Sequence, residues 1–191
     1  MTAVRPGNCP VLLIVDVQVG VMADAWDAPA RIRNVARVLE RARERGVHVI
    51  WVQHQDDDLP RDSAEWQLVP ELVPAAGEGH VYKRYESSFE ETTLEHQLAQ
   101  IGATHIVLAG AATNWCIRAT AYGALDRGYD LTLVKDAHTT RDIDLGDGTR
   151  IEAMNIVKEL NIVMTWLRYP GRKSGTASAE ELTFDKAGGV R

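Results

Sequence analysis

Short runs of apolar residues alternate along this chain with longer stretches in which apolar residues recur at helical spacing. The runs 11–15, 47–52 and 106–109 are mostly apolar, which is typical of strands buried on both faces of a parallel sheet. Between the first two runs, Pro29 to Arg45 has the apolar spacing of a helix, and Gly46 follows its end. Strands that alternate with helices indicate a parallel sheet covered on both faces. We therefore predict an α/β fold with three layers, α/β/α, around a mostly parallel, Rossmann-like six-stranded sheet.

The remaining elements follow from the same pattern. Strands are predicted at 80–82 and 130–135, with an edge strand near 182–184, and helices at 89–101, 115–127 and 148–160. A capping box of Ser88 and Glu91 is expected to open the helix at 89–101, and 161–167 fits either a strand or a helix. The polar stretch 55–79 is expected to form a lid or a wall of a site. We predict a single domain, 1–191, with a core of about 10–170 and a tail, 171–191.

Charge and composition exclude several classes of partner. The chain has 191 residues and a net charge of −6, which argues against binding to nucleic acid or to an anionic membrane. No apolar run is long enough to span a bilayer, and the first ten residues lack the apolar stretch of a signal peptide. Only Cys9 and Cys116 are present, so no disulfide framework is indicated. We expect a cytoplasmic protein, in a compartment that keeps a thiol reduced.

Cys116 stands out because it follows an apolar strand and a small-residue turn, in the first turn of a predicted helix. There the positive end of the helix dipole favours the thiolate, the reactive form of the side chain. The alternative is a buried structural cysteine. Asp16 and Lys83 also lie at the carboxyl ends of predicted strands, where parallel sheets place their ligand sites.

Four sequence blocks resemble those of the isochorismatase-like cysteine hydrolases. They are VLLIVDVQ, VYKRYESSF followed by Thr93-Leu94, LAGAATNWCIRATAYGAL and GYDLTLVKDAH, in this order between about Pro10 and about Pro170. That superfamily includes nicotinamidase, carbamoylsarcosine amidase, ureidoacrylate and biuret hydrolases, and isochorismatase itself. The resemblance implies a hydrolase of small molecules that needs no cofactor.

By this resemblance, Asp16, Lys83 and Cys116 form a catalytic triad. A carboxylate can accept the thiol proton and return it to a leaving nitrogen, and a nearby ammonium favours the thiolate. Taken singly, Asp16 also fits a helix cap or a salt bridge with Lys83, and Lys83 also fits a solvated surface charge. The resemblance further implies a cis peptide at Ala111–Ala112 and an oxyanion hole made by the backbone N–H groups of Ala112 and Cys116; the alternative is an ordinary small-residue turn.

Several side chains are candidates for the substrate pocket. Gln18 matches a recurrent glutamine of the family and shares a side with Asp16, although it also fits a role in bridging backbone groups. Trp115 either lines the pocket or packs in the core. The other pocket candidates are Tyr85, Phe89, Trp66 and His54, and Thr113 and Asn114 are expected to cap the helix.

The histidines do not predict a metal site. Nicotinamidases bind a metal through an Asp-x-His pair after the second strand, whereas this chain reads Val52-Gln53-His54-Gln55-Asp56. The six histidines are spread along the chain without ligand spacing. We therefore predict no metal, which makes nicotinamide a less favoured substrate, and we expect His54 and His138 to be solvated or hydrogen-bonded.

Three functions remain open at this point. The first is hydrolysis of a C–N bond in a small amide, ureide or carbamoyl compound through a Cys116 thioester. The second is hydrolysis of a vinyl ether, as in isochorismatase, for which only Arg84, Arg118 and Arg141 are placed to bind a dianionic substrate. The third is a catalytically silent binding domain on the same fold. Relatives are commonly dimers or tetramers, so a homo-oligomer is also expected.

Overall fold

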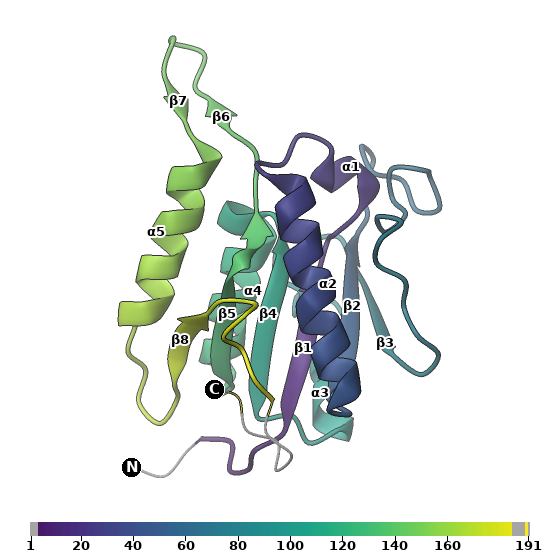
Figure 1. Ribbon diagram of the computed structural model, residues 1–191, viewed down its shortest axis with the longest axis vertical. Helices are drawn as coiled ribbons and strands as arrows, with labels where there is room; N and C mark the ends of the chain where they lie inside the picture. Colours follow the sequence, from purple (N-terminus) through teal and green to yellow (C-terminus); the bar gives the residue numbers. More distant parts are fainter. Residues whose placement is uncertain (1–3, 185–189, 191) are drawn as a thin grey trace.

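A six-stranded sheet forms the centre of the molecule (Figure 1). The computed structural model describes residues 4–184 and 190. The strands are β1 (Pro10–Val15), β2 (His48–His54), β3 (Gly79–Lys83), β4 (His105–Ala111), β5 (Asp130–Thr139) and β8 (Ser174–Ala177). They lie in the order β3-β2-β1-β4-β5-β8, and each neighbouring pair is parallel. The predicted α/β fold with a parallel six-stranded sheet is confirmed.

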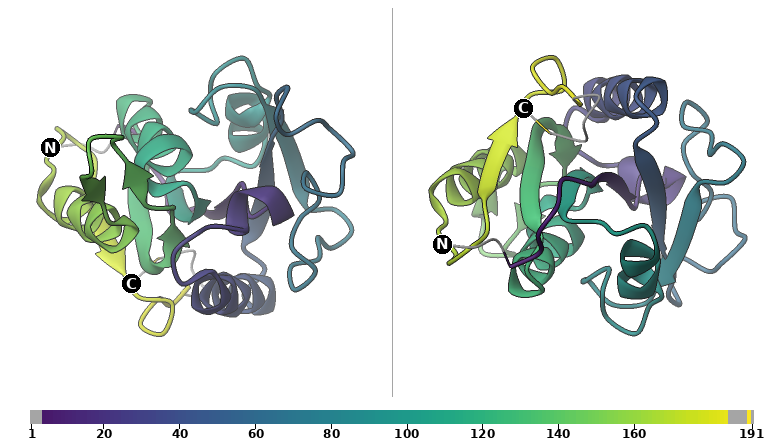
Figure 2. Two further views of the ribbon diagram at one scale, coloured as in Figure 1. Left: turned by 90° about the horizontal axis from the view of Figure 1, so that it is seen from above. Right: turned by 90° about the horizontal axis from the view of Figure 1, so that it is seen from below.

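Helices cover both faces of this sheet, as the views from above and below show (Figure 2). The helices are α1 (Val19–Met22), α2 (Ala28–Glu44), α3 (Leu94–Gln100), α4 (Arg118–Asp126) and α5 (Ala153–Trp166), with a π-helical turn, η1 (Thr113–Ile117), before α4. A small hairpin of β6 (Ile143–Asp144) and β7 (Arg150–Ile151) projects beyond the amino end of α5 (Figure 1). No helix among residues 4–184 and 190 is long and apolar enough to cross a membrane.

The apolar run of β1 supplies both halves of the core. Val11, Leu13 and Val15 pack with apolar residues of α3, α4 and α5 on one face of the sheet. Leu12 and Ile14 pack with apolar residues of α2 on the other face. Successive side chains of a strand point to opposite faces, so a central strand needs apolar residues at every position.

Gly110 allows β4 to pass closely beside the end of β1. Its φ is +124°, and a Cβ atom at this position would lie 1.9 Å from the carbonyl oxygen of Val15. The register between β4 and β5 also shifts between Leu108 and Gly110, as at a β-bulge. The chain therefore needs glycine here to bring Ala111 and the following turn next to Asp16.

We predict that Gly110→Ala prevents stable folding. The added methyl group would overlap backbone atoms, and alanine disfavours this positive φ, so we expect a loss of roughly 4 kcal/mol or more in the free energy of unfolding. Urea denaturation followed by circular dichroism measures the loss. Gly175→Ala in β8 is the matched control, because a Cβ atom there meets nothing within 4 Å. Equal stability of the two variants would contradict the prediction.

The predicted helix at 89–101 is wrong at its amino end, where α3 begins only at Leu94. Glu91 has a left-handed backbone, with φ of 48°, which interrupts a right-handed helix. The Ser88 hydroxyl shares a hydrogen bond of 2.8 Å with the Thr120 hydroxyl of α4, so it does not act in a capping box. A tertiary contact with α4 has replaced the local one.

Two other expectations need correction near the carboxyl end. The predicted helix at 148–160 begins at Ala153, after the β6–β7 hairpin, and it continues through the ambiguous segment 161–167 as far as Trp166. The outer strand of the sheet is β8, not the segment 182–184. Leu182 and Phe184 pack instead against the α2 side of the core. Residues 185–189 and 191 of the predicted tail lie outside the described residues.

Candidate functional site

Three polar side chains from different parts of the chain meet beside the carboxyl ends of β1, β3 and β4. Asp16 directly follows β1, Lys83 ends β3, and Cys116 lies in the π-helical turn after β4. Lys83 Nζ lies 2.7 Å from Asp16 Oδ2 and 3.1 Å from Cys116 Sγ. The parallel sheet therefore brings together the three residues that the sequence singled out.

The backbone of Asp16 is turned out of the strand direction. Its φ is 51°, in the left-handed region, which aspartate adopts more readily than most residues. Its N–H donates to the Val52 carbonyl oxygen over 2.8 Å. The Asp16 side chain is buried, and its Oδ1 has no hydrogen-bond partner among the described residues. This oxygen is therefore available to accept a proton.

Lys83 is a fully buried ammonium group. Burial alone lowers the pKa of Lys83, but the negative charge of Asp16 and the contacts with Asp16 and Cys116 outweigh it, and the net pKa lies above the usual value. The ammonium forms an ion pair with Asp16 and donates to Cys116 Sγ and, over 3.2 Å, to His54 Nδ1. A lysine has three hydrogens to donate, and three side chains contact this ammonium.

The Cys116 thiol is protonated in this arrangement. Burial and the adjacent Asp16 carboxylate raise the pKa of Cys116 to about 12, although the Lys83 charge acts in the opposite direction. Lys83 favours the thiolate, as expected, but burial and the charge of Asp16 outweigh its effect. The thiol needs a base at the moment of attack, and Asp16 is the carboxylate next to it.

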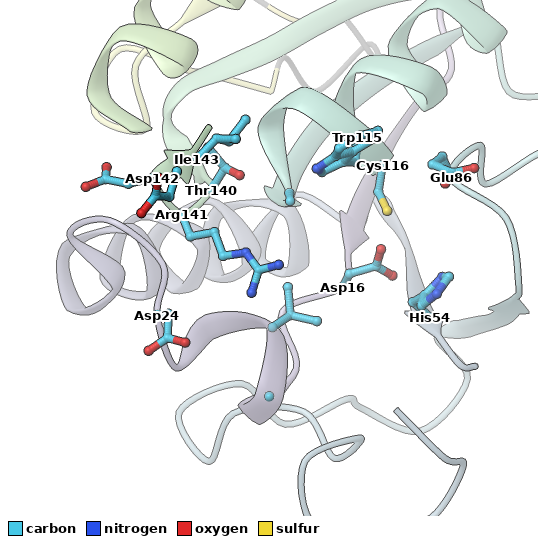
Figure 3. A pocket seen from close by; sticks show the side chains of 14 residues that line it. Asp16, Asp24, His54, Glu86, Trp115, Cys116, Thr140, Arg141, Asp142 and Ile143 are labelled. Atoms are coloured by element: carbon cyan, nitrogen blue, oxygen red, sulfur yellow. The ribbon is translucent and has the colours of Figure 1, made fainter. Parts of the chain in front are cut away.

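A pocket of about 700 Å³ opens over these side chains. Figure 3 shows Asp16, His54 and Cys116 at one end and the Arg141 guanidinium directed into the hollow. The lining residues are Asp16, Gly20, Val21, Asp24, His54, Glu86, Ala112, Trp115, Cys116, Thr140, Arg141, Asp142, Ile143 and Asp144. A small molecule can thus reach the sulfur from solvent.

The turn after β4 carries the predicted oxyanion-hole residues. The Ala111–Ala112 peptide is cis, and Ala112 lines the pocket together with Cys116. The N–H groups of Trp115 and Ile117 donate to the Ala112 carbonyl oxygen, each over 3.1 Å. Donors within this turn thus hold the Ala112 carbonyl.

Gln18 bridges backbone groups. Its side-chain nitrogen donates to the carbonyl oxygens of His54 and Trp66, over 3.0 and 2.8 Å, and its oxygen accepts from the His54 N–H over 2.8 Å. It is fully buried and does not line the pocket. Of its two predicted roles, the structure supports the bridging one.

The aromatic pocket candidates have different positions. Trp115 lines the pocket and is 58% exposed. Phe89 is a core residue stacked on Tyr129, and Trp66 is buried beside Tyr82. Tyr85 is exposed and lies outside the lining. The prediction that Phe89, Trp66 and Tyr85 line the pocket is therefore corrected. The segment of Phe89 packs against α4, that of Trp66 packs against β3, and Tyr85 faces solvent.

The stretch 55–79 contributes no lining residue to the pocket described above. It braces the start of α1 instead, where Val19 and Gly20 donate to the carbonyl oxygens of Gln67 and Glu65. Thr140–Asp144, after β5, forms a wall of the pocket, of which only Arg141 was a sequence-based candidate. A strand extended to Thr139 is the signal that would have found it, since residues after such a strand face the site.

Thr113 and Asn114, in the turn after β4, do not cap a helix as expected. No side-chain capping bond is made at η1 or at α4 among the described residues. The Thr113 hydroxyl pairs with His138 Nδ1 over 2.9 Å, and Asn114 accepts from the Thr140 hydroxyl over 2.6 Å. His138 Nε2 pairs with Asn161 Oδ1 over 3.0 Å, so His138 is a satisfied core histidine, as expected.

We predict an acid-labile fold because of this core histidine. Burial lowers the pKa of His138 to about 4, so the folded protein keeps it neutral while the unfolded chain binds a proton below about 6.5. Stability therefore falls as pH drops from about 6.5 to 4, by about 3 kcal/mol for this residue.

Urea denaturation across that pH window tests the prediction. His138→Gln, though less stable at pH 7, should lose less stability on acidification than the unmodified protein. His96→Gln, at an exposed position of α3, should leave the slope unchanged. Parallel curves for His138→Gln and the unmodified protein would contradict the assignment.

Among the described residues, Asp16, His54 and Cys116 form the one group of potential metal ligands whose ligand atoms are close together. Their ligand atoms lie within 4.8 Å of one another. The Lys83 ammonium, however, contacts all three side chains, so it occupies the position of a cation and opposes a second one. The geometry thus favours a site that works without a metal.

The pocket lies at the carboxyl ends of the parallel strands, where α/β proteins of this class bind their small-molecule ligands. The family model for the isochorismatase domain matches residues 10–167. The chain belongs to the isochorismatase family.

Curated relatives and solved structures agree with this assignment. Streptothricin hydrolase of Streptomyces noursei is 33% identical over 154 residues, which are 76% of this chain and 60% of that protein. Maleamate amidohydrolase of Pseudomonas putida is 27% identical, covering 72% of this chain and 76% of that protein. An isochorismatase structure from Pseudomonas putida KT2440 has a TM-score of 0.79 at 28% identity and covers 90% of this chain and 88% of that one. The chain spans only 60% and 50% of the two streptothricin hydrolases that it matches. These similarities agree with the family assignment, and the named curated relatives are hydrolases.

Proposed function

We propose that the protein cleaves a C–N bond of a small amide, ureide or carbamoyl compound, with Cys116 as nucleophile. One observation carries the proposal. The Lys83 ammonium contacts both the Asp16 carboxylate and the Cys116 sulfur at the floor of an open pocket. A thiol, a base and a fixed positive charge are the parts that covalent catalysis by cysteine needs.

The first half of the reaction forms a thioester. Asp16 takes the Cys116 proton as the sulfur attacks the substrate carbonyl carbon, and the N–H groups of Ala112 and Cys116 receive the oxyanion. The C–N bond then breaks, and Asp16 gives its proton to the departing amine or ammonia. Lys83 remains protonated and balances the charge that moves between Asp16 and the sulfur.

The second half releases the acid. Asp16, again ionised, takes a proton from a water molecule, and the oxygen of that water molecule attacks the thioester carbon. The C–S bond breaks, and the Cys116 sulfur recovers the proton from Asp16. The protein returns to its starting state with one water consumed.

The charges of the pocket favour an amide over a dianionic vinyl ether. Asp24, Glu86, Asp142 and Asp144 line it in addition to Asp16, against the Arg141 guanidinium. Arg118 is paired with Glu159, and neither Arg118 nor Arg84 is among the lining residues. An excess of carboxylates repels a dianion. The vinyl-ether reaction is therefore the second candidate, followed by a silent binding domain.

Ammonia release from a library of small amides, ureides and carbamoyl compounds tests the proposal. Intact-protein mass spectrometry during turnover should detect an acyl adduct on Cys116 with active compounds. If no active compound forms an adduct on Cys116, or if only vinyl ethers are hydrolysed, the thioester mechanism is contradicted. The names of relatives, which include N-carbamoylsarcosine amidase of Arthrobacter, guide the choice of compounds.

We also propose a homo-oligomer, a dimer or a tetramer, in the cytoplasm. Two large apolar side chains of α5, Ile162 and Trp166, are 61% and 72% exposed, and such surfaces are often buried in oligomers. Cys9 and Cys116 are free thiols, which a reducing compartment preserves. Light scattering after gel filtration measures the mass in solution, and a monomer would contradict the oligomer.

A further inference from the structure

The Lys83 ammonium has a third partner that the proposed reaction does not use. His54, the last residue of β2, places Nδ1 at 3.2 Å from Lys83 Nζ. Its other ring nitrogen, Nε2, lies 2.9 Å from Asp56 Oδ2. A chain of contacts thus runs from the exposed Asp56 carboxylate through His54 to the buried ammonium.

The hydrogens in this chain have only one consistent arrangement. Lys83 is a donor, so the nitrogen that faces it, His54 Nδ1, accepts and carries no hydrogen. The hydrogen of the neutral ring is therefore on Nε2, which donates to Asp56. If Nδ1 carried the hydrogen instead, two donors would face each other and the third ammonium hydrogen would have no acceptor.

The backbone of His54 and the side chain of Asp56 are each held by hydrogen bonds outside the row of contacts from Asp56 to Lys83. Gln18 bonds the N–H and the carbonyl oxygen of His54. Asp56 Oδ1 accepts the N–H groups of Asp58 and Leu59, over 2.9 and 2.7 Å, which leaves Oδ2 directed at the ring. These contacts position the imidazole before any substrate binds.

We propose that His54, oriented by Asp56, is a positioning residue that aims the Lys83 ammonium at the Cys116 sulfur. It acts by accepting the third hydrogen of Lys83, so that the ammonium cannot rotate away from Asp16 and Cys116. Its effect on turnover rests on the proposed function, whereas its effect on the thiol is a property of the free protein. Because Lys83 lowers the pKa of Cys116, a misplaced ammonium leaves less thiolate.

Alkylation of Cys116 by iodoacetamide measures this effect without a substrate. In a Cys9→Ser background, which leaves one thiol, His54→Leu should slow alkylation on the order of tenfold, since a charge-assisted hydrogen bond is lost. His54→Asn should stay within about threefold of the unmodified rate, because its Oδ1 offers an acceptor close to the position of Nδ1. His48→Leu, at the exposed start of β2, is the matched control and should leave the rate unchanged. An unchanged or faster rate in His54→Leu, or a rate in His54→Asn as slow as in His54→Leu, would overturn the proposal.

The imidazole tautomer gives a second test, which can still be made if the His54→Leu variant does not fold. Nitrogen NMR of the unmodified protein should show His54 with its hydrogen on Nε2. Asp56→Asn retains an oxygen for the Asp58 and Leu59 N–H groups and turns an amide N–H₂ toward the ring, so the hydrogen should move to Nδ1 and alkylation should slow. A hydrogen on Nδ1 in the unmodified protein would overturn the proposal.

Turnover separates this inference from the proposed function. With an active amide, His54→Leu should lower kcat and leave KM nearly unchanged, because His54 acts through Lys83. If no amide is hydrolysed but the alkylation and tautomer results hold, the proposed function fails and the positioning role stands. If Cys116-dependent hydrolysis is found and His54→Leu turns over normally, the positioning role alone fails.

Discussion

Cys116→Ala should abolish amide hydrolysis, with a loss in kcat of at least about 10⁴-fold. The variant removes the atom that attacks the carbonyl, and no other thiol lies beside Asp16 and Lys83 among the described residues. Only substrate binding and the oxyanion donors remain, and these give a small residual rate in other hydrolases. Ammonia release under saturating substrate measures the loss.

The fold of this variant should be retained. The Cys116 side chain is small and partly exposed at the pocket, so its truncation leaves no large cavity. Cys9→Ser is the control for general effects of thiol removal, since the Cys9 thiol contacts the Ile101 carbonyl at 3.4 Å, near the opposite end of the sheet. Turnover that persists in Cys116→Ala would exclude a thioester and favour the vinyl-ether reaction.

Lys83→Met should destabilise the fold by about 3–5 kcal/mol and also abolish turnover. The substitution leaves the Asp16 carboxylate 1% exposed and without its counter-ion at 2.7 Å. An unpaired buried charge is costly because the protein interior solvates it poorly. Urea denaturation at pH 7 measures the change in the free energy of unfolding.

A double substitution isolates the charge effect from the loss of packing. Asp16→Asn combined with Lys83→Met removes both charges, and asparagine tolerates the left-handed backbone at position 16. This protein should be more stable than Lys83→Met alone, although it should remain inactive. Lys135→Met is the matched surface control, because the pair of Lys135 with Glu181 is exposed and should contribute no more than about 1 kcal/mol. A Lys83→Met protein as stable as this control would show that the pair does not matter for folding.

The parts that could be predicted from the sequence are those that depend on local pattern. Apolar runs such as 11–15 and 106–109 identified central strands, because a strand covered on both faces needs an apolar residue at every position. Asp16 and Cys116 lie just beyond such runs, so their meeting at one edge of the sheet followed from parallel pairing. The family assignment rested on the same segments and is confirmed by the family match over 10–167.

Other features depend on contacts between residues far apart in the chain. The Ser88 hydroxyl pairs with Thr120, so the expected capping box is absent and α3 begins late. The stretch 55–79 braces α1, while Thr140–Asp144 lines the pocket, because β5 runs to Thr139. Local spacing carries no information about such partners.

The sequence by itself determined the alternation of the central strands with helices and the chemical groups at the strand ends, since burial on two faces and turn geometry depend on neighbouring residues. Only the tertiary structure decided the protonation of these groups. The Cys116 thiol, the Lys83 ammonium and the His54 tautomer depend on which charges lie within a few ångströms and on how much water is excluded. These distances come from the packing of β1, β2, β3 and the turn after β4 against one another, which no single segment of the chain specifies.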